Sequence, residues 1–198
     1  MLEPFHTKGC VEAGCDEAGR GCMAGPVVAA AVILPVGYAN PLLNDSKKLS
    51  EKERNLLRSD IEKNALAYAV SAVSHEEIDE INILNASILG MHRALDQLKV
   101  PFDHILVDGN KFKPYKNVRA TTVVKGDGIY ASIAAASILA KTFRDEFMER
   151  ISVEHPLYRW EKNKGYPTNE HREAILAFGL TQYHRKSFHL KPVQLKMF

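Results

Sequence analysis

Two adjacent carboxylates, Asp16 and Glu17, lie in a glycine-rich stretch that combines groups suited to phosphate chemistry. Neighbouring acids repel each other, so a divalent cation or a protic ligand is a natural reason to place them together. Gly19 and Gly21 lack the Cβ atoms that would keep a ligand away from the backbone, and the donors of Arg20 match a phosphate group. The stretch could therefore hold a cation beside a phosphate, although solvent-exposed turns show the same pattern.

The segment that follows favours a functional site over a solvent-exposed turn. Residues 26–35 are apolar and bounded by prolines, as expected of a strand that is buried on both faces. A shorter strand is expected over residues 9–13. The sequence thus predicts that the acidic pair lies in a turn between two strands.

Two further acids follow predicted strands. Asp108 comes directly after the apolar residues 105–107, and Asp127 comes shortly after the strand expected over 121–124. Because open sheets bind ligands at the ends of their strands, acids from different strands can converge on one point. A carboxylate cluster without histidine or thiolate favours hard cations, Mg²⁺ first and Mn²⁺ second. Two such ions about 3.5 to 4 Å apart would serve in-line displacement at phosphorus.

Simpler structural explanations exist for these acids. Asp108 belongs to an Asp-Gly dipeptide, which is common in turns, and Asp127 could cap the helix that follows it. Asp145 competes with Asp127 for the fourth place in the cluster. It stands four residues after Lys141 on the expected helix, which favours an ordinary ion pair.

The periodicity of the chain predicts an α/β order of elements. Strands are expected over 27–34 and 66–74, and the helix between them begins after Ser50, where Glu53 completes a capping box. Apolar residues at helical spacing then predict one helix over 74–98.

The second half of the chain is predicted to be largely helical. A long helix over 129–151 begins with small residues, which permit close packing against a sheet. After Pro156 the composition becomes polar and aromatic, and Thr168 is expected to cap a helix of about ten residues. These features predict a compact helical region at the C-terminus.

The composition is that of an ordinary soluble protein with one main domain. The 198 residues are 45% hydrophobic and 25% charged, with a formal net charge of +2. Basic residues gather at 111–125 and 159–164 among aromatic side chains, which is compatible with nucleic-acid binding. Three unpaired cysteines, with no signal segment and no long apolar run, favour a cytoplasmic protein without a membrane span.

Six segments together resemble the signature of bacterial ribonuclease HII. Each segment alone is weak or moderate, whereas the ordered set, from about residue 9 to about residue 185, is specific. The segments are DEAGRG with the following AGPVVAA, DSKKL at 45–49, VDG at 107–109, KGD at 125–127, AAASILAK at 134–141 and GYPT at 165–168. The resemblance implies a ribonuclease H-like fold, in which helices flank a five-stranded mixed sheet and a helical C-terminal region follows.

The resemblance also implies roles for individual residues. Four acids are expected to bind the metal ions and carry catalysis: Asp16, Glu17, Asp108 and Asp127. Six residues are expected to bind the substrate: Gly19, Arg20, Gly21, Lys47, Lys141 and Tyr166. The Gly-Arg-Gly segment would read the ribonucleotide, the tyrosine would stack on the sugar at the DNA–RNA junction, and the lysines would hold phosphates. For either lysine, a solvated surface position is the alternative.

The implied reaction is hydrolysis of the phosphodiester on the 5′ side of a ribonucleotide, leaving 3′-hydroxyl and 5′-phosphate ends. The substrates would be RNA–DNA hybrids and single ribonucleotides in duplex DNA, recognised by the 2′-hydroxyl. A monomer is expected, with a catalytic core over 1–155, a substrate-clamping helical region over 156–190 and a flexible tail over 191–198. The related ribonuclease HIII carries an extra N-terminal domain, for which the ten or so residues before the first motif leave no room.

The end of the chain carries one more motif. Gln194, Leu195, Met197 and Phe198 resemble the Gln-Leu-x-Leu-Phe peptide by which bacterial replication proteins dock into the sliding clamp. The alternative is a tail that folds back onto the core, because a match of five residues often arises by accident.

Two other classes of function compete with this interpretation. A nucleic-acid-binding module of the same fold could have lost catalysis, but all four acids are present. Another carboxylate–metal nuclease, such as a junction resolvase, would leave Arg20 and Tyr166 without an evident use, because it has no ribose to read.

Overall fold

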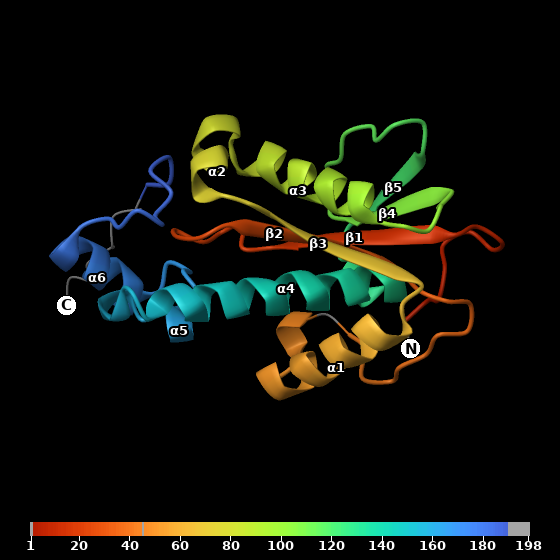
Figure 1. Cartoon of the computed structure of the whole chain (residues 1–198), viewed down its shortest axis with the longest axis horizontal. Coiled ribbons are helices and arrows are strands. Elements are labelled where there is room, and N and C mark those ends of the chain that lie inside the picture. Colours follow the sequence, from red (N-terminus) through yellow and green to blue (C-terminus); the bar gives the residue numbers. More distant parts are fainter. Residues whose placement is uncertain (1, 45, 190–198) are drawn as a thin grey trace, which may run out of the picture.

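The computed structural model describes residues 2–44 and 46–189, which form a sheet with helices on both faces (Figure 1). The five strands lie in the order β3-β2-β1-β4-β5, where β1, β2 and β3 are antiparallel neighbours and β4 and β5 run parallel to β1. The expected α/β fold with a mixed five-stranded sheet is confirmed. The strands are β1 (Glu12–Ala18), β2 (Val27–Ile33), β3 (Ala67–Val73), β4 (His104–Asp108) and β5 (Arg119–Val123).

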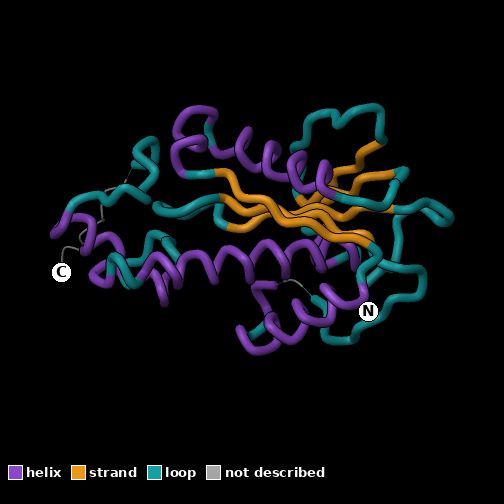
Figure 2. The backbone as a smooth tube through the Cα atoms, in the orientation of Figure 1, coloured by secondary structure: helices purple, strands orange, loops and turns teal. Residues whose placement is uncertain are grey.

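Helices α2 and α3 cover one face of the sheet, and α4, with α1 packed against it, covers the other (Figures 1 and 2). The α-helices are α1 (Glu51–Asn64), α2 (His75–Ile81), α3 (Ile83–Gln97), α4 (Ala131–Ser152), α5 (Trp160–Asn163) and α6 (Asn169–Phe178). The 3₁₀ turns are η1 (Ser46–Lys48), η2 (Gly126–Gly128) and η3 (Pro156–Tyr158). None of the helices formed by the described residues is long and apolar enough to cross a membrane.

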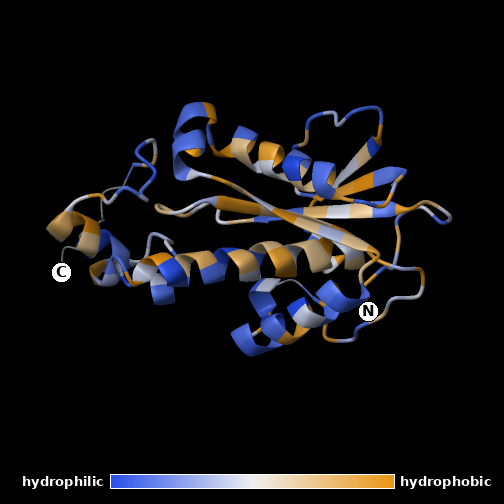
Figure 3. Ribbon diagram, viewed as in Figure 1, coloured by the Kyte–Doolittle hydropathy of each residue, from blue (hydrophilic) through white to orange (hydrophobic). Residues whose placement is uncertain are grey.

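β1 and α4 approach each other closely at Gly14. A Cβ atom at Gly14 would lie 2.2 Å from the backbone carbon of Ser132, so only glycine fits there. Small residues of α4, including Ala134 and Ala135, are fully buried, which confirms the expected close packing of this helix. Figure 3 shows apolar colours along the strands and the inner side of α4, and hydrophilic residues on the outer helices.

The acidic pair lies within a strand, so the predicted turn at this position is wrong. β1 runs on to Ala18, with Asp16 and Glu17 paired to residues of β2. The antiparallel ladder with β2 outweighs the local glycine content, and the chain turns only at Gly19, where φ is 96°. Because side chains alternate along a strand, Asp16 faces α4 with Gly14, whereas Glu17 faces the opposite side of the sheet.

The single helix predicted over 74–98 is also wrong, because it consists of two helices. Asn82 separates α2 from α3 with φ at 64°, and its side chain accepts hydrogen bonds from the amides of Leu84 and Asn85. The apolar spacing continues across this break and therefore gave no sign of it. The capping box of α1 at Ser50 and the Thr168 cap of α6 are both confirmed.

The residues that follow α4 enclose a cluster of aromatic and histidine rings. Trp160 Nε1 donates to His171 Nε2 at 3.0 Å, and His184 Nε2 lies 3.1 Å from the same acceptor. His184 Nδ1 accepts from the amide of Thr181 at 2.8 Å. Every one of these bonds needs an unprotonated acceptor nitrogen, so both histidines are neutral in the folded chain.

We expect acid to destabilise this cluster. Burial lowers the pKa of His171, and burial with the charge of His171 lowers the pKa of His184 from 6.5 to about 4. The unfolded chain therefore binds more protons below pH 6.5, and the stability contribution present above that pH is lost as pH falls to about 4. The loss should be about 3 kcal/mol in the free energy of unfolding. Chemical denaturation at several pH values measures it.

The matched controls separate this effect from general acid denaturation. His184→Gln should flatten the acid slope, while exchange of the exposed His189 for Gln should leave it unchanged. Equal slopes in the wild type and in His184→Gln would contradict a neutral buried His184.

Candidate active site

Asp16, Glu17 and Asp108 lie near one another where two adjacent strands end, although no three of the described site acids offer oxygens that all lie within 4.8 Å of one another. β1 and β4 are parallel, with Cys15 opposite Val107, so Asp16 and Asp108 follow side by side. Burial raises the pKa of Asp16 well above its ordinary value, and the charges of Glu17 and Asp108 raise it further. Burial likewise raises the pKa of Glu17, against the opposing charge of Arg20. Three expected site acids are thus close enough to repel one another.

Asp127 lies in the η2 turn beside this group. Asp108 Oδ1 accepts a hydrogen bond from the amide of Gly126 at 2.7 Å, which ties β4 to the turn that carries Asp127. Asp127 is buried, and its Oδ2 lies 3.6 Å from Lys47 Nζ, whose charge also acts on Glu17. The helix α4 starts only at Ala131, after a residue without a side-chain cap, so Asp127 does not supply that cap.

Asp145 is held by cations instead. Lys141 Nζ donates to Asp145 Oδ1 at 2.7 Å, and Arg54 Nη2 lies 4.0 Å from Asp145 Oδ2. Arg54 also donates to the carbonyls of Ser46 and Leu49, so Asp145 is linked to the turn that carries Lys47. The expected ion pair with Lys141 is confirmed, and Asp127 is the better candidate for the fourth site acid.

The Gly-Arg-Gly loop, residues 19–26, connects β1 to β2 next to the acids. A Cβ at Gly19 would lie 2.0 Å from Arg144 Nε, so the side chain of α4 excludes any other residue there. A Cβ at Gly21 would meet no atom within 4 Å, which leaves its backbone open to a ligand. Arg20 Nη1 lies 3.1 Å from Glu17 Oε1 with half of the arginine side chain exposed, so this ion pair is weak enough to exchange for a phosphate.

The tyrosine loop, residues 164–168, adjoins the Gly-Arg-Gly loop. The amide of Met23 donates to the carbonyl of Gly165 at 2.8 Å, and a Cβ at Gly165 would lie 2.7 Å from Ala24 O. The ring of Tyr166 is partly exposed, with Lys141 Nζ 5.7 Å from its centroid. Burial raises the pKa of Tyr166, and a side-chain hydrogen bond with Cys22 contributes. Lys47 and the Gly-Arg-Gly loop therefore lie beside the acids, and the tyrosine loop with Lys141 adjoins that loop.

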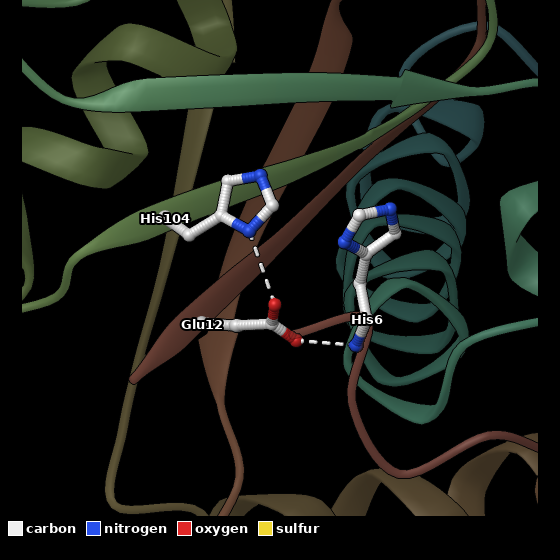
Figure 4. A group of neighbouring side chains, drawn as sticks. All are labelled: His6, Glu12 and His104. Atoms are coloured by element: carbon white, nitrogen blue, oxygen red, sulfur yellow. Dashed lines mark hydrogen bonds and ion pairs between the residues drawn. The ribbon is translucent and has the colours of Figure 1, made fainter. Parts of the chain in front are cut away.

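A second group of potential ligands lies at the opposite end of β1 and β4. His6, Glu12 and His104 are the one set of three described side chains whose potential metal-ligand atoms all lie within 4.8 Å (Figure 4). Glu12 accepts from the amides of His6 and Thr7 and from His104 Nδ1, while His104 Nε2 bonds Thr121 Oγ1. These polar groups are satisfied by one another, so the group fixes the N-terminal segment to the sheet.

The fold and the site define a class of protein. Acids from two parallel strand ends and an adjacent turn, surrounded by basic and aromatic groups on loops, are the features of a ribonuclease H-like hydrolase. The chain belongs to the ribonuclease HII family, whose sequence profile matches residues 13–191.

Individual relatives agree with this assignment. The chain is 64% identical to the ribonuclease HII of Christiangramia forsetii, over 100% of this chain and 99% of the relative. Its fold matches ribonuclease H2 of Pyrococcus horikoshii with a TM-score of 0.75 and 26% identity, over 89% of this chain and 93% of the other. It matches the PCNA:RNase HII complex of Archaeoglobus fulgidus with a TM-score of 0.73 and 27% identity, over 93% and 98% of the two chains.

The predicted resemblance and the ribonuclease H-like fold are confirmed. The chain is an endoribonuclease that degrades RNA in RNA–DNA hybrids, and enzymes of this family depend on divalent metal ions.

Exchanging Asp127 and Asp145 separately should distinguish a metal-binding acid from an ion-pair partner. Asp127→Asn should lower the rate on an RNA–DNA hybrid by about 100-fold or more and shift the Mg²⁺ dependence to higher concentration. Asp145→Asn should keep the Mg²⁺ dependence and raise KM by about tenfold or less, because Lys141 would no longer be held in position to bind a phosphate. Initial rates over a Mg²⁺ titration measure both. The reverse assignment would give the shifted Mg²⁺ dependence in Asp145→Asn.

Proposed function

We propose that the chain cleaves the phosphodiester on the 5′ side of a ribonucleotide, including a single ribonucleotide in duplex DNA, and leaves 3′-hydroxyl and 5′-phosphate ends. The observation that carries this proposal is the position of the Gly-Arg-Gly loop. It begins directly after the strand that holds Asp16 and Glu17, and it is hydrogen-bonded to the loop of Tyr166. A group that reads a ribose would thus adjoin the groups that cut beside it.

The donor set fits hard divalent cations. The four acids offer only carboxylate oxygens, and the raised pKa of Asp16 reflects the cost of ionising a buried group beside two like charges. Asp16, Glu17, Asp108 and Asp127 would hold two Mg²⁺ or Mn²⁺ ions during catalysis. When bound, the ions would activate a water molecule and stabilise the leaving 3′-oxygen.

The basic side chains around the acids would hold the substrate backbone. Lys47 is 77% exposed at its side chain and lies near Asp127, so it can turn from that carboxylate to a phosphate. Lys141 is held by Asp145 and lies 5.7 Å from the centroid of the Tyr166 ring. Arg20 is half-exposed and can exchange its weak pair with Glu17 for a phosphate.

Ribose recognition would depend on the backbone. Space for a ligand at Gly21 allows a main-chain group to contact a 2′-hydroxyl whatever the base. The exposed part of the Tyr166 ring would pack on the next sugar, where a deoxyribose leaves room for it. The pair would select a ribonucleotide followed by a deoxyribonucleotide.

We also propose roles for the C-terminal part of the chain, a protein partner and a cellular compartment. The region 156–190 would help to clamp the duplex, and the tail 191–198 would dock into a sliding clamp through Gln194, Leu195, Met197 and Phe198. Those four residues lie outside the described part of the chain. A solved complex of an archaeal RNase HII with PCNA supports a clamp partner. We also propose a cytoplasmic monomer, in keeping with the free Cys10, Cys15 and Cys22.

The test is cleavage of a DNA duplex that contains one ribonucleotide, with Mg²⁺ present. The wild type should cut once, on the 5′ side of the ribonucleotide, and Asp16→Asn should be slower by at least about 100-fold. Gly21→Ala should fold normally, because its Cβ meets no atom, but should lose rate because the methyl group fills the ligand space. Product ends are read by gel and mass spectrometry.

Parallel substrates distinguish the alternatives. A wild type that leaves the single-ribonucleotide duplex uncut contradicts the proposal, and cutting of an all-DNA duplex would indicate a resolvase-like nuclease. Equal binding to a sliding clamp by the full chain and by a chain truncated before Gln194 would refute docking through the tail.

A further inference from the structure

Two arginines are fully buried behind the Gly-Arg-Gly loop and the tyrosine loop, which are together called the recognition loops below. Arg144 of α4 and Arg185, which follows α6, are both 0% exposed. Within the described ranges, neither guanidinium forms an ion pair with an acid, although buried charges are normally paired. Their hydrogen-bond partners are backbone carbonyls. The two buried guanidinium groups therefore serve to bind backbone carbonyl groups.

Arg144 joins the two recognition loops directly. Its Nε donates to Pro26 O at 2.9 Å and its Nη2 donates to Ala24 O at 3.1 Å, both at the end of the Gly-Arg-Gly loop. Its Nη1 donates to Lys164 O at 2.8 Å, two residues before Tyr166. One rigid, planar group thus bridges loops that are about 140 positions apart in the sequence.

Arg185 holds the same loop from the other side. Its Nε donates to Gly25 O and its Nη1 to Arg20 O, each at 3.0 Å. Its backbone amide donates to Met23 O at 2.8 Å, so three carbonyls of the Gly-Arg-Gly loop are bound by one residue. Burial lowers the pKa of Arg185 to about 10, and the neighbouring charge of Arg144 contributes, so the group is still charged at neutral pH.

The glycines of these loops fit around the buried arginines. A Cβ at Gly19 would collide with Arg144 Nε at 2.0 Å, and a Cβ at Gly25 would lie 2.3 Å from Met148 Sδ. Gly21 alone among the three meets no such contact. The first glycine of the motif is thus required both by its φ of 96° and by Arg144, and the second is left for the ligand.

We propose that Arg144 and Arg185 are positioning residues that fix the spacing between the Gly-Arg-Gly loop and Tyr166, and thereby set the preference for a ribonucleotide followed by a deoxyribonucleotide. The proposal rests on the proposed function of these loops. Neither guanidinium reaches the surface, so both act through the loops and not on the substrate. Lysine would keep the charge but could not bridge the separate carbonyls with a planar fork of donors.

The test compares Arg144→Lys and Arg185→Lys with Arg150→Lys, a control at an exposed arginine of the same helix. Hydrogen exchange of the amides of residues 20–25 and 164–166, measured without substrate, reports on the loops. The ratio of kcat/KM on a single-ribonucleotide duplex to that on a long hybrid reports on recognition. Both buried variants should exchange about tenfold faster in these segments and lose about tenfold in the ratio, while the control matches the wild type.

A general loss of folding would lower kcat/KM on both substrates alike, so the ratio of the two values would not change. Gly19→Ala keeps both arginines but collides with Arg144, so it should reproduce the change in exchange if the lysine variants fail to fold. Unchanged exchange in the loops, or equal losses on both substrates, would overturn the proposal. A wild type that cuts only the long hybrid would refute the proposed function and the preference for a ribonucleotide followed by a deoxyribonucleotide. In that case, hydrogen exchange of the loops would still decide whether the two arginines hold them.

Discussion

The fold must hold like charges together against their repulsion. Asp16 is buried beside Glu17 and Asp108, and all three influences raise the pKa of Asp16. Parallel pairing of β1 with β4 and the bond from Gly126 to Asp108 keep the acids in place. The apolar contacts between the sheet and its helices provide the stabilisation that offsets this electrostatic cost. A bound divalent cation would remove much of it, which is why the same feature that destabilises the chain suits it to metal-dependent hydrolysis.

One face of α4 carries three residues that contact Asp16 and the loops beside it. Ser137 hydrogen-bonds Asp16, Lys141 pairs with Asp145 beside the Tyr166 ring, and Arg144 joins the Gly-Arg-Gly loop to the tyrosine loop. These residues are four and three positions apart, so they point to the same side of the helix. The close contact of β1 with α4 at Gly14 sets the distance at which this face meets the acids. Asp16, the Lys141–Asp145 ion pair and the two loops are therefore linked to a single helix.

Features that depend on neighbouring residues, such as helix caps, could be predicted from the sequence. Features that depend on contacts between distant segments could not. The succession of strands and helices along the chain, the α1 capping box and the Thr168 cap follow from periodicity and residue type. The acids were misplaced in a turn because the ladder with β2 extends β1 past them. The break between α2 and α3 at Asn82 could not be predicted, because the apolar residues keep their helical spacing across it. Arg144 and Arg185 gave no signal, because their partners are carbonyls far away in the chain, and only the folded structure brings these together.

Thermal unfolding of the wild type and of Asp108→Asn, each with and without Mg²⁺, tests the charge repulsion most directly. Asparagine can still accept the bond from Gly126 but removes one charge from the cluster. Asp108→Asn should melt a few degrees higher than the wild type without Mg²⁺, because about 1 kcal/mol of repulsion is relieved. The wild type should also gain more from Mg²⁺ than the variant does. A lower melting temperature of Asp108→Asn without Mg²⁺, and an equal gain from the ion, would contradict it.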